Sequence, residues 1–202
     1  MMKRILQIVL AIVIIVLGYL LYESLMEPIR FNKEAKYRQN LVVDRLKDIR
    51  TLQSVYKSEF GHFTGSLDSL IDFYKAGTIH VVRQIGSLDD SVAVARGLIR
   101  RDTILVPVRD SLFTKKANFY IDSLKYVPIV GVPFEMAATV HETISKVKIP
   151  LFEARTPNDV WMRGMDRQLV VNKNDDETKL KKYPGLKVGS VESPNNNAGN
   201  WE

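Results

Sequence analysis

Residues 5–21 read ILQIVLAIVIIVLGYLL, and the rest of the chain is organised around this stretch. Its 17 residues, at a helical rise of about 1.5 Å, cover roughly 25 Å, the short end of what spans a bilayer's hydrocarbon core. Tyr22 can extend the segment into the interface, and Lys3 and Arg4 stand immediately before it. The stretch therefore predicts a transmembrane anchor over residues 1–22.

The residues that follow the apolar run indicate a retained anchor. A signal peptidase site needs small residues at alternating positions, whereas residues 18–24, GYLLYES, are mostly bulky. We therefore expect an uncleaved, single-pass signal anchor in a bacterial inner membrane, with the N-terminus inside and the domain exported. Basic residues lie on both sides of the span, namely Lys3 and Arg4 before it and Arg30, Lys33, Lys36 and Arg38 after it.

The composition is that of a folded protein, with 46% hydrophobic and 26% charged residues among 202. The chain has no cysteine, which excludes disulfides, thiolate metal ligands and cysteine nucleophiles. Its net charge of +6 is spread along the chain and is not gathered into a Lys/Arg block interleaved with aromatic residues. We therefore expect no nucleic-acid partner.

A helical pattern resumes after the anchor and continues to Phe60. Pro28 lies between the two segments, and because proline removes one helical hydrogen bond we expect a kink there. Residues 23–61 are predicted as a kinked amphipathic helix, so that anchor and helix form one rod of about 55 residues. Its apolar stripe consists of Phe31, Ala35, Val42, Leu46, Ile49, Tyr56 and Phe60, and Gln39 and Gln53 occupy positions on the same stripe. The other face carries the charged residues Lys36, Asp44, Lys47, Asp48, Lys57 and Glu59.

This helix has two interpretations, a coiled-coil stalk or a helix whose C-terminal half packs into the domain. Val43, Leu52 and Val55 broaden the stripe beyond a coiled-coil seam, which favours packing into the domain. Gly61 is expected to end the helix, and Ser66 to cap a second short helix.

From residue 78 onward the pattern changes to that of strands. The predicted strands are 78–85, 102–109, 134–141, 146–154 and 167–172, whereas residues 88–101 stay undecided between helix and strand. Pro107 and Pro150 indicate edge strands or bulges. Helices first and strands afterwards predict an α+β fold with a mainly antiparallel sheet over residues 62–190.

The end of the chain is polar. Residues from 172 onward are predicted as a polar loop followed by a short apolar piece, and residues 191–202 as an Asn-rich tail. Trp201 either packs onto the domain, which is the favoured interpretation, or is presented to a partner.

Over residues 1–77 the layout resembles type IV pilins and type II secretion pseudopilins. The likeness is carried by residues 55–63, VYKSEFGHF, followed by SLDSL at 66–70: a tyrosine late in the first helix, a glycine near an aromatic residue, and paired leucines. A prepilin has a glycine just before its apolar stretch and a glutamate five residues later. Gly18 and Glu23 have that spacing, but the apolar run precedes them. The resemblance therefore implies a pilin-like shape on an uncleaved anchor.

Side chains that could carry chemistry are scattered. The chain has no GxSxG elbow and no Gly-rich phosphate loop. We expect no enzymatic activity and no cofactor. The histidines, His62, His80 and His141, lack metal-site spacing, and the acids Asp89, Asp90 and Asp110 are interpreted as a helix start and a strand end.

One polar cluster is a candidate Ca²⁺ site, namely Asn172, Asn174, Asp175, Asp176 and Glu177. Oxygen ligands in a loop suit this ion. The resemblance adds that some pseudopilins hold calcium in a late loop. Because the spacing is not DxDxDG, a solvated polar turn is the favoured interpretation.

Two functions fit these features. The first is a structural or assembly subunit of a bacterial envelope complex, with membrane lipid and with protein partners or further copies of itself. The alternative is a membrane-tethered module that binds a periplasmic ligand or a cell-wall polymer. Candidate partner-binding residues are Phe31, Val42, Leu46, Ile49, Tyr56 and Trp201.

Overall fold

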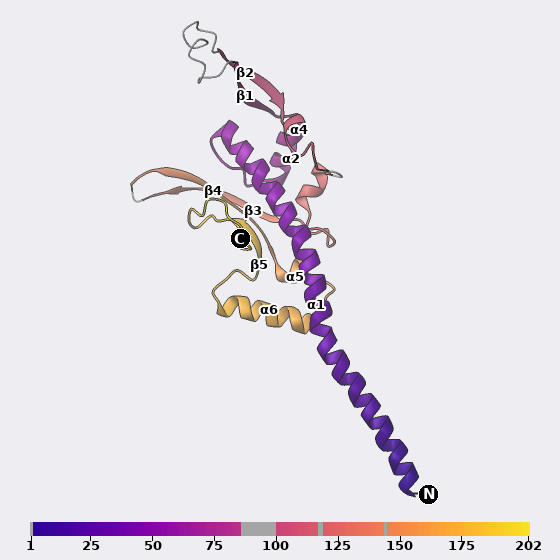
Figure 1. The fold of residues 1–202 in the computed structure, drawn as a ribbon. Helices are drawn as coiled ribbons and strands as arrows, with labels where there is room; N and C mark the ends of the chain where they lie inside the picture. The colour runs from indigo at the N-terminus through magenta and orange to yellow at the C-terminus, as the bar shows by residue number, and fades with distance from the viewer. Residues whose placement is uncertain (1, 86–99, 117–118, 144) are drawn as a thin grey trace, which may run out of the picture.

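Helix α1, Met2–Phe60, links the apolar N-terminal segment to the folded domain (Figure 1). The structure, a computed structural model, describes residues 2–85, 100–116, 119–143 and 145–202. The elements after α1 complete an α+β fold, as predicted, but the strands form two small antiparallel sheets and not one. Most of the undecided segment 88–101 lies outside the described residues.

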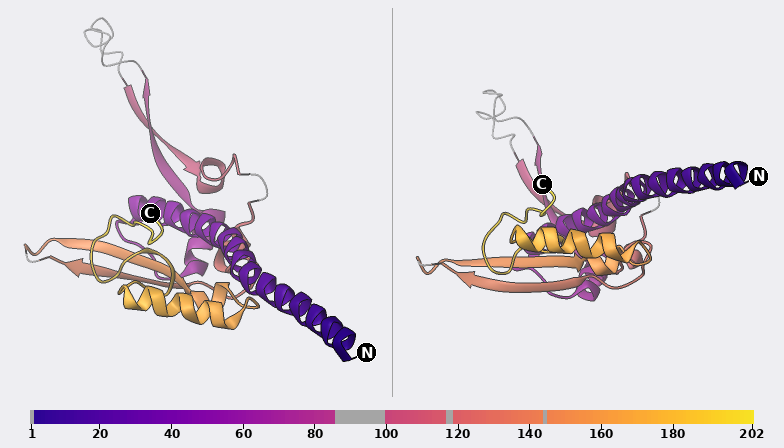
Figure 2. Two further views of the ribbon diagram at one scale, coloured as in Figure 1. Left: turned by 60° about the horizontal axis from the view of Figure 1, so that its bottom comes forward. Right: turned by 90° about the horizontal axis from the view of Figure 1, so that it is seen from below.

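α1 is one continuous helix of 59 residues, Pro28 included. It curves along its length without a break (Figure 2). The side chains of residues 6–22 are exposed around the whole helix, whereas Val42, Leu46 and Ile49 are buried in the domain. The predicted rod is therefore confirmed, and its second half packs into the domain.

The segment after α1 folds as the sequence predicts. Gly61 has a positive φ of 76°, and its N–H donates to the carbonyl of Lys57 at 2.8 Å. Helix α2, Leu67–Ala76, follows, and the side chain of its N-cap Ser66 accepts the N–H of Ser69 at 3.3 Å. Local capping thus fixes where α1 ends and where α2 begins.

The first sheet is a two-stranded ribbon. Strand β1, Thr78–Ile85, pairs antiparallel with β2, Arg100–Pro107, and the ribbon projects from the domain at the end opposite the N-terminus (Figures 1 and 2). The predicted strand 102–109 ends early because Pro107 is followed by a turn of helix, α4, Val108–Ser111, whose Val108 is buried.

The second sheet has the order β3–β4–β5, all antiparallel. Its strands are β3, Glu135–Glu142, β4, Lys148–Pro157, and β5, Gly185–Gly189. β5 pairs with only the last five residues of β4, from Glu153. Pro150 therefore lies where that edge of β4 is not paired with β5, as its sequence position indicated.

The predictions of a strand at 167–172 and of a polar loop after it are wrong. Both belong to helix α6, Arg167–Lys179, which starts where Asp166 accepts the N–H of Leu169 at 2.9 Å. A strand would have placed Leu169 and Val171 on one face. The helix instead directs Val170 into the core, and Lys173 pairs with Glu177 at 2.9 Å one turn apart.

The core lies between the second half of α1 and the three-stranded sheet. α1 contacts β4 and β5, and also α2 and the short 3-10 helix η1, Ile121–Lys125. Phe63, from the loop after α1, packs on Phe152 of β4 with ring centroids 4.8 Å apart. Helix α5, Asn158–Trp161, adds the buried Trp161. The helix that leaves the apolar segment is thus the central element of the core.

Candidate functional site

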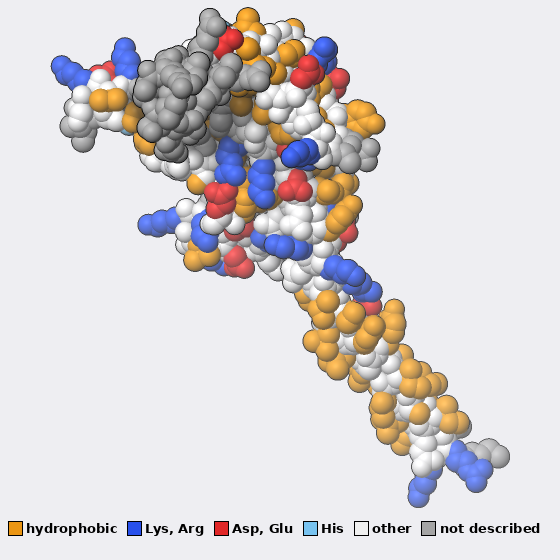
Figure 3. All heavy atoms as spheres, turned by 45° about the horizontal axis from the view of Figure 1, so that its top comes forward, with side chains coloured by type: hydrophobic (Ala, Val, Ile, Leu, Met, Phe, Trp, Pro, Cys, Tyr) orange, Lys and Arg blue, Asp and Glu red, His pale blue; other side chains and the backbone are white. Residues whose placement is uncertain are grey.

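The N-terminal part of α1 is long and apolar enough to cross a membrane, and the side chains of residues 6–22 are all exposed. Figure 3 shows this rod covered with hydrophobic side chains, with Lys and Arg at its tip and again where it meets the domain. This segment is a candidate membrane span or signal anchor.

The predicted partner-binding stripe is mostly inside the protein. Val42, Leu46 and Ile49 are buried against the domain's own core, so these three side chains form no surface for a partner. Phe31 and Tyr56 are half-buried against the same core. The stripe's period located the core-facing side of α1, because a helix that packs on its own domain has the same pattern as one that packs on a partner.

Trp201 is half-buried and packs against the core, the favoured of its two interpretations. The tail runs along the outer edge of β5, where the N–H of Gly189 donates to Ala198 at 3.0 Å and that of Asn200 to Lys187 at 3.0 Å. The tail therefore covers a sheet edge that would otherwise be open to further strands.

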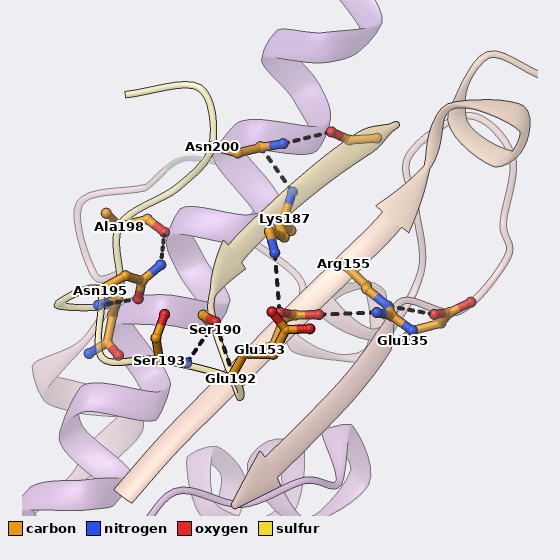
Figure 4. Close-up of polar contacts among 12 residues, drawn as sticks. Glu135, Glu153, Arg155, Lys187, Ser190, Glu192, Ser193, Asn195, Ala198 and Asn200 are labelled. Atoms are coloured by element: carbon orange, nitrogen blue, oxygen red, sulfur yellow. Dashed lines mark hydrogen bonds and ion pairs between the residues drawn. The ribbon is translucent and has the colours of Figure 1, made fainter. Parts of the chain in front are cut away.

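A charged cluster on the sheet was not predicted from the sequence (Figure 4). Glu153 of β4 is only 6% exposed, and its carboxylate lies 3.2 Å from Arg155 Nη1 and 3.5 Å from Lys187 Nζ of β5. Arg155 also donates to Glu135 of β3 at 2.9 Å, and this carboxylate raises the pKa of Arg155. The cluster borders a hollow of about 180 Å³ beside Val191. The only signal in the sequence was that Glu153 and Arg155, two charged residues two positions apart, lie at the C-terminal end of an apolar predicted strand.

Asp48 is a second buried carboxylate, and it corrects the prediction that it lies on the outer face of α1. Its side chain accepts from Lys116 Nζ at 2.6 and 2.7 Å, while Arg45 donates to the carbonyl of Ser123. Burial raises the pKa of Asp48 even though Lys116 and Arg45 act in the opposite direction. This pair joins α1 to a segment 68 residues away.

The five candidate Ca²⁺ ligands lie on helix α6 and not in a loop. The helix divides them between two hollows: Asn174 and Asp175 line one, whereas Asn172, Asp176 and Glu177 line the other. Among the residues that the structure describes, no group of three or more His, Cys, Asp or Glu is placed to hold a metal ion. The arrangement does not bring the five side chains to one point.

Two of these side chains have a structural partner. Nδ2 of the buried Asn158 donates to Asn174 at 2.9 Å and to Glu177 at 2.7 Å. Its Oδ1 accepts from Trp161 Nε1 at 3.0 Å. The Nδ2 end of Asn158 therefore holds α6 against α5, and its Oδ1 end satisfies the buried indole N–H of its own helix.

The three histidines lie on different elements, His62 in the loop after α1, His80 on β1 and His141 on β3. His80 contacts Glu59 twice, through its ring Nδ1 at 2.8 Å and its backbone N–H at 3.0 Å. These hydrogen bonds lower the pKa of Glu59. Asp110 lies in α4, beyond the strand it was predicted to end, and Asp89 and Asp90 lie outside the described residues.

The β1–β2 ribbon carries exposed apolar side chains on both faces. Val81 pairs with Ile104, and both are exposed on one face. Val82 and Leu105, each 61% exposed, belong to the other face because neighbouring residues of a strand point to opposite sides. Exposed large apolar side chains gathered on one protrusion are typical of an interaction surface.

Comparisons of this chain with family models, with curated proteins and with solved structures found no match. The resemblance of residues 1–77 to pilins therefore stays a prediction.

Proposed function

We propose that this protein is a single-pass inner-membrane protein whose exported, pilin-like domain is a structural or assembly subunit of a bacterial envelope complex. The observation that carries the proposal is the continuity of α1, which leads from the apolar segment into the core of the domain.

Such continuity suits a fixed subunit better than a tethered receptor. A receptor that searches for its ligand needs a flexible linker, and linkers are rich in Gly, Ser or Pro. Here the only proline between Tyr22 and Phe60 is Pro28, and the helix passes through it. The domain is therefore held close to the membrane and within a narrow range of angles, which favours packing among neighbouring subunits.

The β1–β2 ribbon supplies a surface for a protein partner or a second copy. An isolated two-stranded ribbon is marginally stable in water, and each of its strands has one edge unpaired among the described strands. A partner that covers Val82 and Leu105 would remove these apolar side chains from water, and a partner that adds a strand would pair an open edge. Either contact would stabilise the ribbon.

The first test measures assembly. The full chain, purified in detergent from its native membranes, is expected to elute in chromatography with light scattering as an oligomer or a complex. The double variant Val82→Asp/Leu105→Asp is expected to elute as a monomer, because charges on the ribbon oppose its burial. Thr114→Asp, exposed in a loop, is the matched control and should leave the mass unchanged. A wild-type monomer from native membranes would contradict the proposal.

The second test measures topology. A periplasm-requiring phosphatase fused after Glu202 is expected to be active, and a cytosol-requiring reporter at the same position inactive. The reverse pattern would place the domain inside the cell, which the basic residues Arg30, Lys33, Lys36 and Arg38 would then explain.

A membrane-tethered binding module is the second candidate, favoured by the Glu153 cluster. A buried carboxylate between two cations beside a hollow is the kind of polar site that could orient a sugar or peptide. Titration of the full chain with soluble cell-wall fragments tests it. Saturable binding that Arg155→Ala abolishes would favour this function over assembly.

A further inference from the structure

The strands of the β1–β2 ribbon differ in what covers their outer edges. In β1 the backbone N–H of His80 donates to Glu59 Oε1 of α1 at 3.0 Å, so it points away from β2. Antiparallel partners alternate between pairs that exchange backbone hydrogen bonds and pairs that do not. His80 and its register partner Leu105 therefore form a pair that exchanges none, and the backbone N–H and C=O of Leu105 point to the outer edge of β2.

This alternation sets which backbone groups lie on the outer edge of β2. Thr103 is two residues before Leu105, so its N–H and C=O point outward as well. Val108, three residues after Leu105, is in the opposite phase, and its N–H donates back across the ribbon to the carbonyl of Gly77 at 3.1 Å. Pro107 is in phase with Leu105 and has no N–H to pair. The outer edge thus presents the backbones of Thr103 and Leu105.

The outer edge of β2 is open. Glu59 occupies the edge of β1 at its base, and the C-terminal tail covers the edge of β5. Between the parts of the chain that the structure describes, no hydrogen bond reaches the outward backbone groups of Thr103 or Leu105. Figures 1 and 2 show no other helix or strand alongside β2 beyond its base. An edge left in this state is a template for a further strand.

We propose that the outer edge of β2 binds an extended, acidic segment of a different polypeptide chain as a third strand of the ribbon. Backbone hydrogen bonds to Thr103 and Leu105 supply the affinity, and the exposed Leu105 and Ile104 contact its side chains on opposite faces. The two strands of the ribbon contain three arginines and one aspartate, which complements an acidic segment. The inference rests on the proposed function, because it specifies the partner of the ribbon.

A second copy that pairs through the same edge does not suit membrane anchoring. The ribbon projects from the end of the domain opposite the N-terminus (Figure 1). Antiparallel pairing of two β2 strands would therefore direct the two apolar segments away from each other, whereas the proposed anchors enter one membrane. Parallel pairing would need the strands shifted by one residue, which the two-fold symmetry of a closed dimer does not allow. The occupant is therefore a segment of a different chain.

The probe for this edge is a synthetic peptide of about seven alternating valine and glutamate residues that carries a fluorescent label. Titrated with the purified full chain in detergent, the peptide is expected to bind saturably by fluorescence anisotropy, with the signal of empty micelles subtracted. The same peptide N-methylated at every residue cannot donate hydrogen bonds to the edge, and it is expected not to bind.

Two proline variants separate the edge of β2 from that of β1. Leu105→Pro removes an outward N–H and leaves the pairing with β1 intact, because proline is tolerated where the N–H of an edge strand faces solvent. The lost hydrogen bond is expected to weaken peptide binding by about tenfold. Val82→Pro is the matched control, because Val82 is exposed to the same 61% and its N–H points to the outer edge of β1. Its peptide binding should equal that of wild type.

Absence of saturable binding, or an equal loss in the Leu105→Pro and Val82→Pro variants, would overturn the proposal. Thr103→Pro, at the other outward position, is expected to repeat the loss, which separates an effect of the edge from a local fault at residue 105. A mass that doubles without peptide and falls to the monomer in Leu105→Pro would assign the edge to a second copy instead. A monomer from native membranes that still binds the peptide would contradict assembly alone, so the two proposals fail separately.

Discussion

Gln53 and Thr64 hold each other by two hydrogen bonds across the end of α1. Gln53 Nε2 donates to the carbonyl of Thr64 at 2.6 Å, and the N–H of Thr64 donates to Gln53 Oε1 at 3.2 Å. Gln53 is completely buried, in phase with the apolar stripe of the helix. A polar residue at a core position is tolerated here because both ends of its amide are paired with one residue of the following loop.

Gln53→Ala is expected to destabilise the domain by about 1–3 kcal/mol, because both backbone groups of the half-buried Thr64 lose their partner. Chemical denaturation of the full chain in detergent, followed by tryptophan fluorescence, measures the change. Gln39→Ala is the matched control, since Gln39 lies on the same stripe but is only half-buried. Equal losses for the two variants would show that the hydrogen bonds to Thr64 do not matter.

Gly189 ends β5 at a place where no side chain fits. Its φ is +74°, and a Cβ there would overlap the carbonyl oxygen of Phe152 in β4. Gly189→Ala is expected to cost about 2–5 kcal/mol, from the left-handed backbone and the overlap together. Gly164 has a φ of +83° with open space around it, so Gly164→Ala should cost only the backbone part, about 1–2 kcal/mol. Thermal unfolding of both variants tests the ranking.

The Glu59–His80 contact predicts a pH dependence. Hydrogen bonds from His80 lower the folded-state pKa of Glu59 below the ordinary value of 4.5. A lowered pKa means that the contribution is present above pH 4.5 and is lost as the pH falls through the folded-state pKa. Glu59→Gln should therefore lower stability by about 0.5–1 kcal/mol at pH 7 and have little effect in acid. Melting temperatures of both proteins across this range test the trend, and a constant difference would contradict it.

Asn158 is expected to be the residue on which the docking of α6 depends. Asn158→Ala removes the acceptor of the buried Trp161 Nε1 and the donor to Asn174 and Glu177, at an expected cost of about 1–3 kcal/mol. Asn172→Ala, an exposed amide on the same helix, should stay within about 0.5 kcal/mol of wild type. Hydrogen exchange of the α6 amides should rise in the first variant only.

Calcium is expected to leave the melting temperature unchanged, whether it is added or removed with a chelator. Asn174 and Glu177 already accept from Asn158, and the five candidate ligands are divided between two hollows. A Ca²⁺-dependent rise that Asp176→Asn abolishes would instead establish the site predicted from the sequence.

Two sequence predictions were wrong, and three of the predicted partner-binding residues are buried, for one reason. The strand at 167–172, the outward position of Asp48 and the partner role of Val42, Leu46 and Ile49 were all inferred from patterns that are local to a segment. Asp48 is buried because Lys116, far along the chain, reaches it. α6 is helical because its packing against Asn158 and its N-cap Asp166 both favour a helix. Together they outweigh the strand preference of the apolar run that begins at Leu169. The charged pair of Glu153 with Lys187 likewise exists only once β4 and β5 are paired.

The sequence by itself determined the N-terminal third of this protein. The apolar run, the helical period of the stripe, Gly61 and Ser66 are local signals, and local signals suffice for α1 and α2 because a helix makes its hydrogen bonds within itself. Only the tertiary structure decided that the apolar stripe of α1 is buried in the chain's own domain and not against a partner, how the strands divide into two sheets, and that α6 lies beside Pro28. Those features depend on contacts between residues distant in sequence, which the pattern of any single segment does not contain.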